Sequence, residues 1–261
     1  MNILVCIKQV PDAEAIKKDP ESNEMILEGV PEILNPYDGY ALEAAARLKD
    51  KNSETKIVVL TVGSDKDKAA LKTCLGIAAD KAYRVNSGNS VDALSMSDIL
   101  AKAIQKIEET EGKFDAVFCG QQTTDWESAQ VGSELAERLS YPQITGCLEC
   151  ETKGSGLKVS QKAENGKLIE SIPFPCLLTF TQPGYDPRFP TIKRKMAANK
   201  TVIPVIEEAE LEFDTSKTAS ALDTLKACAP AKRKGGMMIA EESMEDSTAK
   251  LVSLLSEAHV I

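Results

Sequence analysis

Residues 114–139 read FDAVFCGQQTTDWESAQVGSELAERL. The run 114–119 is short, mostly apolar and bounded by a glycine, which predicts a buried strand. A polar loop follows and leads to Gly132, at the start of a helix that runs to Leu139. A strand that passes through a loop into a helix is the repeating unit of a parallel α/β sheet. This segment therefore predicts an α/β fold.

The loop between this strand and this helix has the properties of a phosphate-binding loop. Gly120 and Gly132 permit a close approach of the backbone, and the amides at a helix N-terminus attract anions. Polar side chains add to these amides; they are Gln121, Gln122, Thr123, Thr124, Ser128 and Gln130. Asp125 and Glu127 could serve as acid or base, as ribose ligands or as solvated loop residues. The spacing leaves two interpretations open, a nucleotide-binding loop and a polar loop that only caps the helix.

Strands also alternate with helices before this loop. Strands are expected at 2–10, 56–62 and 81–85, helices from Asn35 onward and at 65–79 and 90–109, and a small hairpin within 12–33. Asn35 and Asp38 are expected to cap the first helix. Four alternations within about 120 residues predict a doubly wound parallel sheet with right-handed crossovers. Such sheets place ligands at the carboxyl ends of their strands.

The pattern changes after Pro142. Two strand-like runs, 157–161 and 167–172, flank the turn signal Glu164-Asn165-Gly166 and predict a β-hairpin. Further features are an apolar strand at 175–181, weak helical character at 182–199, an acidic and then basic stretch without period at 202–243, and an amphipathic helix at 246–258. We therefore expect an α/β nucleotide-binding domain over residues 1–200 and a C-terminal arm over 201–261 that packs on another chain.

Composition excludes several classes of protein. A net charge of −9 without a long basic stripe disfavours nucleic-acid binding. Seven scattered cysteines favour a reducing compartment. The pair Cys147 and Cys150 lacks the further ligands that zinc needs, because the single histidine is His259, so no metal is expected. The chain starts without a charged leader, and its first apolar run is too short for a signal peptide or a membrane span, which indicates a cytoplasmic protein.

Catalytic motifs are scarce. The dinucleotide fingerprint G-x-G-x-x-G does not follow the first strand, which disfavours an ordinary dehydrogenase, and the P-loop motif is missing. A Ser-His-Asp or Cys-His site would depend on His259. A stand-alone nucleotide-binding stress protein of related architecture needs only the first ~140 residues. The chain is therefore expected to have no catalytic residue and no activity by itself.

Several blocks, in order, resemble the β subunit of electron transfer flavoproteins. They are VCIKQVPD at 5–12, LNPYD at 34–38 with ALEAAARLK at 41–49, GIAADKA at 76–82, the loop 120–132, and PRF at 187–189. The likeness covers nearly the whole chain and is weakest over 205–243. It implies an adenine-nucleotide-binding, Rossmann-like fold and a heterodimer with an α subunit.

The resemblance also implies which residues bind the nucleotide. They are Cys6, Asn35, Asp38, Val62, Gly120, Gln121, Gln122, Thr123, Thr124, Asp125, Ser128, Ala129, Gln130 and Val131. In some members the nucleotide is a structural AMP, and in electron-bifurcating members it is a second FAD that NADH reduces. The runs 8–12 and 129–132 are similar to the bifurcating branch, and Lys8 leaves the first strand where a flavin would lie. That branch commonly has Gly-Asp where this chain has Trp126-Glu127. FAD is expected, with AMP as the alternative.

Partners follow from the same resemblance. Together with the α subunit, the chain is expected to pass electrons from NADH to an acyl-CoA or other flavin dehydrogenase, or to ferredoxin, by flavin-based bifurcation. The alternative is a carrier that accepts electrons from acyl-CoA dehydrogenases. The PRF motif and the basic stretch after it resemble a partner-recognition loop, so Arg188, Phe189 and Ile192 are expected to dock the dehydrogenase.

Overall fold

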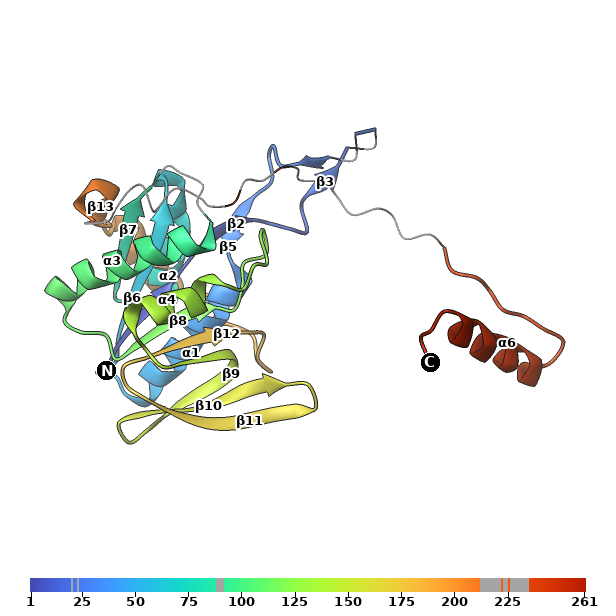
Figure 1. The fold of residues 1–261 in the computed structure, drawn as a ribbon. Coiled ribbons are helices and arrows are strands. Elements are labelled where there is room, and N and C mark those ends of the chain that lie inside the picture. Colours follow the sequence, from blue (N-terminus) through green and yellow to red (C-terminus); the bar gives the residue numbers. More distant parts are fainter. Residues whose placement is uncertain (20, 23, 88–91, 212–221, 223–224, 226–234) are drawn as a thin grey trace.

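A computed structural model describes residues 1–19, 21–22, 24–87, 92–211, 222, 225 and 235–261. Within them a nine-stranded sheet has the order β11-β10-β9-β12-β8-β1-β6-β7-β13 (Figure 1). Its strands are β1 (Asn2–Cys6), β6 (Lys56–Gly63), β7 (Lys81–Asn86), β8 (Ala116–Gly120), β9 (Gln143–Lys153), β10 (Gly156–Ala163), β11 (Gly166–Pro173), β12 (Cys176–Phe180) and β13 (Val205–Glu207). The α-helices are α1 (Pro36–Lys51), α2 (Lys68–Ile77), α3 (Ala93–Glu111), α4 (Val131–Leu139), α5 (Ile192–Lys200) and α6 (Met244–Glu257).

The centre of the sheet is parallel. β1 pairs with β6 on one side and β8 on the other, and parallel pairing continues outward to β7 and β13 and to β12 and β9. The chain leaves β1 towards β6 and β7 and returns on the opposite side at β8, so the strand order reverses between β1 and β8. The predicted doubly wound α/β fold is confirmed.

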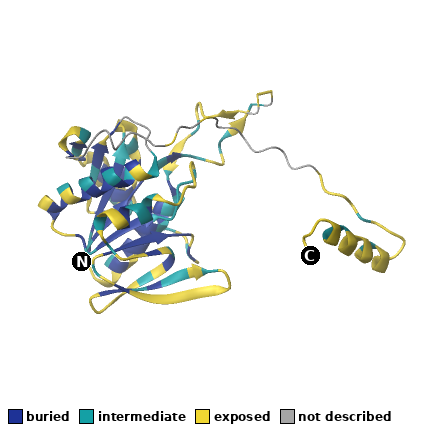
Figure 2. Ribbon diagram, viewed as in Figure 1, coloured by how far each residue is buried: buried dark blue, intermediate teal, exposed yellow. Residues whose placement is uncertain are grey.

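Helices cover both faces of the parallel strands (Figure 1). Leu42 of α1 and Ala198 of α5 belong to the apolar cluster on one face, which α2 joins, and Ile104 of α3 belongs to the cluster on the other, together with α4. Consecutive residues of β1 enter different clusters, Ile3 the first and Leu4 the second, and both are fully buried. Figure 2 shows the central strands of the sheet in the colour of buried residues. Burial on both faces explains the continuous apolar runs of these strands.

The first predicted strand, 2–10, is divided. β1 ends at Cys6, and residues Gln9–Pro11 form β2, which pairs antiparallel with β5 (Glu32–Leu34) outside the main sheet. The division occurs because the amide of Lys8 donates to the Asp38 carboxylate instead of to a strand. The small hairpin expected in the following excursion is β3 (Lys17–Lys18) with β4 (Met25–Ile26).

Two strands of the sheet have no clear sequence signal. β9 contains Gly146 at a φ of 65° and has an irregular burial pattern, and β13 is three residues long.

The predicted hairpin is confirmed as β10 and β11, whose last pair joins Ala163 to Gly166. α3 begins at Ala93, and its expected start at Ser90 lies outside the described residues.

The main sheet extends into the part of the chain that the sequence pattern assigns to the C-terminal arm. β13 pairs with β7, so the sheet continues beyond residue 200. Half of the stretch 202–243, namely residues 212–221, 223–224 and 226–234, lies outside the described residues. The last predicted helix is confirmed as α6, which lies apart from the sheet in Figure 1 and buries no residue. The division at residue 200 and the packing of this part on another chain stay predictions.

Candidate functional site

A cavity of about 610 Å³ opens at the carboxyl ends of β1, β6 and β8. The strand order reverses here, and open α/β sheets bind their ligands at such a point. The loop after β8 forms one wall and the first turns of α3 form another. The lining residues are Cys6, Ile7, Lys8, Asp38, Val62, Asp92, Ala93, Met96, Leu100, Cys119, Gly120, Gln121, Gln122, Thr123, Trp126, Ser128, Ala129, Gln130, Val131, Gly132 and Leu222.

Asp38, in the first turn of α1, joins the two central strands at this edge. Its Oδ2 accepts a hydrogen bond from the amide of Lys8 at 2.7 Å, and its Oδ1 accepts one from the amide of Gly120 at 3.1 Å. Lys8 follows β1, and Gly120 ends β8. The expected capping role of Asp38 is wrong, because each of its oxygens is used by one of these strand ends.

Burial changes the titration of this carboxyl. Asp38 is 5 % exposed, and desolvation raises its pKa to about 7, although hydrogen bonds from Lys8, Asn35 and Gly120 act in the opposite direction. The carboxyl therefore exchanges its proton near neutral pH. The charge on this wall of the cavity follows the same titration.

Asn35 is fully buried and holds the loop after β8. Its Nδ2 donates to the carbonyl of Gln122 at 2.9 Å, and its Oδ1 accepts from the amide of Thr124 at 3.3 Å. Its side chain makes no hydrogen bond that caps α1, so the expected capping role is wrong. Both ends of the amide are used by the loop, which makes Asn35 a positioning residue.

Further contacts fix the loop. Lys8 Nζ donates to Asp125 Oδ2 at 2.6 Å, and the amide of Glu127 donates to the carbonyl of Thr123 at 2.9 Å. Glu127 and Ala129 have φ values of 52° and 54°, in the left-handed region that is unfavourable for residues with a side chain. Such conformations persist where the surroundings impose them, commonly at binding sites.

The helix that follows the loop offers positive electrostatic potential to the cavity. Gln130 precedes α4 and makes no side-chain hydrogen bond that caps it. The first amides of a helix have no partner inside the helix and carry partial positive charge. Because Gln130, Val131 and Gly132 all line the cavity, a phosphate group fits at this end of it.

The two glycines have a role in packing within the protein, in addition to the predicted approach to phosphate, which stays a prediction. A Cβ on Gly120 would lie 2.4 Å from Asp38 Oδ1 and 2.8 Å from Tyr37 Cβ, and a Cβ on Gly132 would lie 2.5 Å from Thr179 Cγ2. Gly120 therefore lets β8 approach α1, and Gly132 lets α4 approach β12. Contact within the protein requires both glycines, whatever the cavity binds.

The structure brings most of the expected ligand residues to one cavity. Those that line it are Cys6, Lys8, Asp38, Val62, Gly120, Gln121, Gln122, Thr123, Ser128, Ala129, Gln130 and Val131. Asn35, Thr124 and Asp125 lie behind the lining and support the loop. Sequence reasoning missed the α3 wall, which includes Asp92 and Met96. A signal for it existed, because α3 follows β7, and the carboxyl end of β7 lies at the same edge of the sheet.

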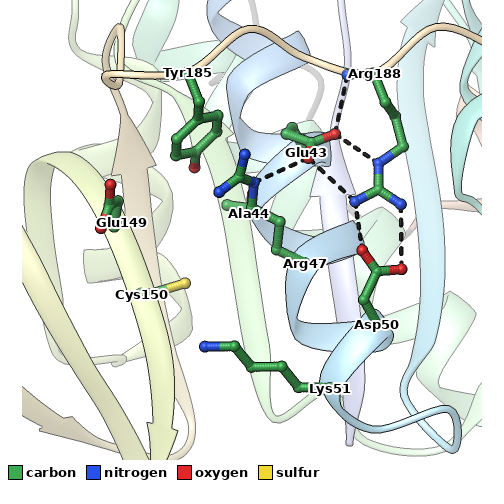
Figure 3. A pocket seen from close by; sticks show the side chains of 9 residues that line it. All are labelled: Glu43, Ala44, Arg47, Asp50, Lys51, Glu149, Cys150, Tyr185 and Arg188. Carbon is green, nitrogen blue, oxygen red and sulfur yellow. Dashed lines mark hydrogen bonds and ion pairs between the residues drawn. The ribbon is translucent and has the colours of Figure 1, made fainter.

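A second cavity, of about 380 Å³, lies between α1, β9 and the segment 185–188 (Figure 3). Arg188 crosses one side of it and pairs with Glu43 at 2.8 Å and with Asp50 at 2.6 Å. The Arg47 guanidinium lies 3.4 Å from the centre of the Tyr185 ring. Arg188, an expected docking residue, is therefore bound within the chain.

The other two expected docking residues are free of such contacts. Phe189 is 89 % exposed and Ile192 is 82 % exposed, so both present apolar surface to solvent. Ile192 begins α5, whose first turn also carries Lys193 and Lys195. This surface keeps the apolar and basic character that the sequence predicts.

The described residues contain no group of three histidine, cysteine or acidic side chains placed to hold a metal ion. Burial raises the pKa of the Cys147 and Cys150 thiols, so both stay protonated near neutral pH. Cys228 lies outside the described residues. No described helix has the length and apolar character that crossing a bilayer requires.

The family model of the electron transfer flavoprotein domain matches residues 24–211. That range contains α1, the cavity loop and β13. The chain belongs to the electron transfer flavoprotein family. The family likeness expected from the sequence blocks is thereby confirmed.

Named relatives align with 82 % to 100 % of the chain. It is 37 % identical over 265 residues to the electron transfer flavoprotein subunit beta of Megasphaera elsdenii, with 98 % of this chain and 97 % of the relative covered. It is 35 % identical over 266 residues to the caffeyl-CoA reductase-Etf complex subunit CarD of Acetobacterium woodii, with 100 % of both chains covered. Protein FixA of Azotobacter vinelandii is 36 % identical over 220 residues, which cover 82 % of this chain and 78 % of the relative.

Proposed function

We propose that this chain is the β subunit of a heterodimeric electron transfer flavoprotein and that its larger cavity binds FAD. The observation that carries the proposal is the cavity at the reversal of strand order, bounded by a helix N-terminus without a side-chain cap. The full-length alignment with β subunits supports the same assignment. When bound, FAD supplies the hydride and electron chemistry, and the protein contributes its position and its electrostatic surroundings.

The residues in and around the cavity have different roles in binding the nucleotide. The amides at the start of α4 would donate hydrogen bonds to the phosphates, and the side chains of Gln122 and Thr123 offer further hydrogen bonds. Asp38 and Asn35 hold the walls in place. Lys8, with a side chain that is 41 % exposed, lies at the mouth, and its pairing with Asp125 fixes its charge there.

Within the heterodimer, the chain would help to pass electrons from NADH to a flavin dehydrogenase or to ferredoxin. The similarity to a subunit of a caffeyl-CoA reductase-Etf complex supports the proposal that this chain functions in a complex with a dehydrogenase. The chain contributes no catalytic side chain, and the complex, located in the cytoplasm, carries the activity. The alternative is a carrier with structural AMP that accepts electrons from acyl-CoA dehydrogenases.

α6 supports the need for an α subunit. None of its residues is buried, and Leu251 and Val252 are 45 % and 48 % exposed. An amphipathic helix of this length gains most of its stability from packing its apolar face. We expect α6 amides to be protected from hydrogen exchange in the heterodimer and unprotected in the chain alone. Equal exchange in both samples would contradict burial of α6 on the α subunit.

Nucleotide analysis of the purified heterodimer tests the choice of cofactor. The complex is denatured, and the released nucleotides are separated by chromatography and quantified against protein. Two FAD per heterodimer are expected. One FAD and one AMP would contradict the FAD assignment and leave the simple electron carrier.

A charge substitution tests the binding mode. Gln130→Glu places a carboxylate at the start of α4, where it would compete with phosphate, so nucleotide content should fall. Gln105→Glu makes the same chemical change at an exposed position of α3 and should leave the content unchanged. Full nucleotide occupancy in the Gln130 variant would show that phosphate does not lie at this helix end.

A further inference from the structure

Trp126 lines the nucleotide cavity and is 62 % exposed. It is the only tryptophan of the chain. An indole ring gains favourable free energy when its apolar surface leaves water, and this one is left largely uncovered. A large aromatic side chain at the rim of a cavity therefore offers a binding surface to whatever enters the cavity.

The residues on both sides of Trp126 in the loop are held in place by contacts within the chain. Asp125, immediately before it, is paired with Lys8 at 2.6 Å. Glu127, immediately after it, has a φ of 52° and donates its amide to the Thr123 carbonyl. The backbone of Trp126 is thus held between an ion pair and a strained residue. A ring on a preorganised loop loses less conformational freedom on binding than a ring on a mobile one.

The same loop carries the phosphate end of the cavity. Residues 128–131 and the start of α4 follow Trp126 directly, and all of them line the cavity. A nucleotide whose phosphate lies at this helix end keeps its planar rings in the rest of the cavity or at its mouth, where Trp126 lies. Planar aromatic rings stack favourably on an exposed indole face.

We propose that Trp126 is a binding residue whose indole stacks on an aromatic ring of the bound nucleotide. The inference rests on the proposed function and adds a specific contact to it. The ring is either the adenine or the isoalloxazine, and both offer the same flat π surface. The indole of Trp126 would make a stacking contact that a Gly-Asp sequence at positions 126 and 127 could not make.

The test measures the nucleotide affinity of the full-length chain by calorimetry, since Trp126 and the helix end that would hold the phosphate both belong to this chain. ADP and FAD are titrated into the natural protein and into Trp126→Ala, Trp126→Leu and Trp126→Phe. The Ala and Leu variants should lose roughly ten- to hundredfold in affinity, and the Phe variant should lose only a few-fold. Leu94→Ala is the matched control, since Leu94 is 52 % exposed on α3 and does not line the cavity.

The two ligands identify the ring. A loss for ADP and FAD alike places adenine on Trp126, and a loss for FAD alone places the isoalloxazine there; each result supports the inference. Natural affinity for both ligands in Trp126→Ala would overturn the inference and leave the proposed function intact. A natural chain that binds neither ligand would contradict both. Equal losses in the Phe and Ala variants would show that stacking is not the contact.

Discussion

The carboxylate of Asp38 accepts a hydrogen bond from the amide of Gly120, which lies 82 residues later in the chain. Its second oxygen accepts from the amide of Lys8. One buried side chain thereby joins α1 to the ends of the two strands between which the sheet reverses its order. Because the same residue lines the cavity, the shape of the binding site and the stability of the fold depend on one carboxyl group.

Asp38→Asn should therefore destabilise the protein. The side chain of Asn has one oxygen and one NH2 group. The NH2 group would therefore face the backbone N–H of either Lys8 or Gly120, and that buried donor would lose its acceptor. An unsatisfied buried group costs about 1–3 kcal/mol. Urea denaturation measures the loss, with exposed Glu28→Gln as the control for a carboxyl-to-amide change. An unfolding free energy equal to the natural one would contradict the bridging role.

The stability of the natural protein should depend on pH through Asp38. The folded pKa is about 7, above the ordinary value of 3.8 that applies to the unfolded chain. As pH rises from 4 to 7, the unfolded chain therefore loses this proton first, and the contribution of Asp38 to stability falls; above pH 7 it stays constant.

The measurement is the unfolding free energy of the natural protein minus that of Asp38→Asn, followed from pH 4 to pH 8. This difference should decrease towards neutral pH and then level off, because the Asn variant lacks the group that titrates. A difference that increases over the same range would mean that hydrogen bonds from Lys8 and Gly120 outweigh burial and lower the pKa.

The sequence predicted the sheet well because its central strands are buried on both faces. That burial requires continuous apolar runs, and such runs are visible without tertiary information. The sequence also predicted which loop borders the cavity. It failed at Asn35 and Asp38, where the local pattern N-P-x-D is typical of helix capping. Asp38 bonds to Lys8, 30 residues before it, and the other partners of the two side chains are 82 to 89 residues away. A local sequence pattern contains no information about partners at such distances. β13 escaped prediction because three residues provide too little periodicity.

Gly120→Ala should lower the melting temperature. Its Cβ would lie within 3 Å of Asp38 Oδ1 and of the Cβ and backbone carbon of Tyr37, so α1 or β8 would have to move. Overpacking of this kind costs about 1–3 kcal/mol. Gly184→Ala is the control, because a Cβ there has no atom within 4 Å and the backbone needs no positive φ. Nucleotide loss from Gly120→Ala at an unchanged melting temperature would instead support the phosphate explanation.

Arg188→Met should destabilise the chain. The substitution removes the guanidinium and keeps an apolar side chain at position 188. Glu43 has a side chain that is 4 % exposed; it would lose the Arg188 guanidinium and keep Arg47 and the backbone amide of residue 188 as partners. The loss should be about 2 kcal/mol, less than for a fully buried pair, because the Arg188 side chain is 35 % exposed and water screens it. Glu43→Gln with Arg188→Met completes a double-mutant cycle. Additive effects in that cycle would show that the two side chains do not interact.

Ile192→Ala should weaken docking to the acceptor dehydrogenase and leave the fold and nucleotide content unchanged. Ile192 is 82 % exposed, so its truncation removes almost no internal contact. It lies in the same exposed segment as Phe189, with Lys193 and Lys195 beside it, and an apolar anchor with a charged rim is typical of an interface. The measurement is the rate of electron transfer at limiting dehydrogenase. The control is Leu168→Ala, which truncates a 52 % exposed leucine on β11, at the opposite edge of the sheet from β13. Equal transfer rates for the two variants would exclude Ile192 from the docking surface, since both then remove only solvent-exposed carbon.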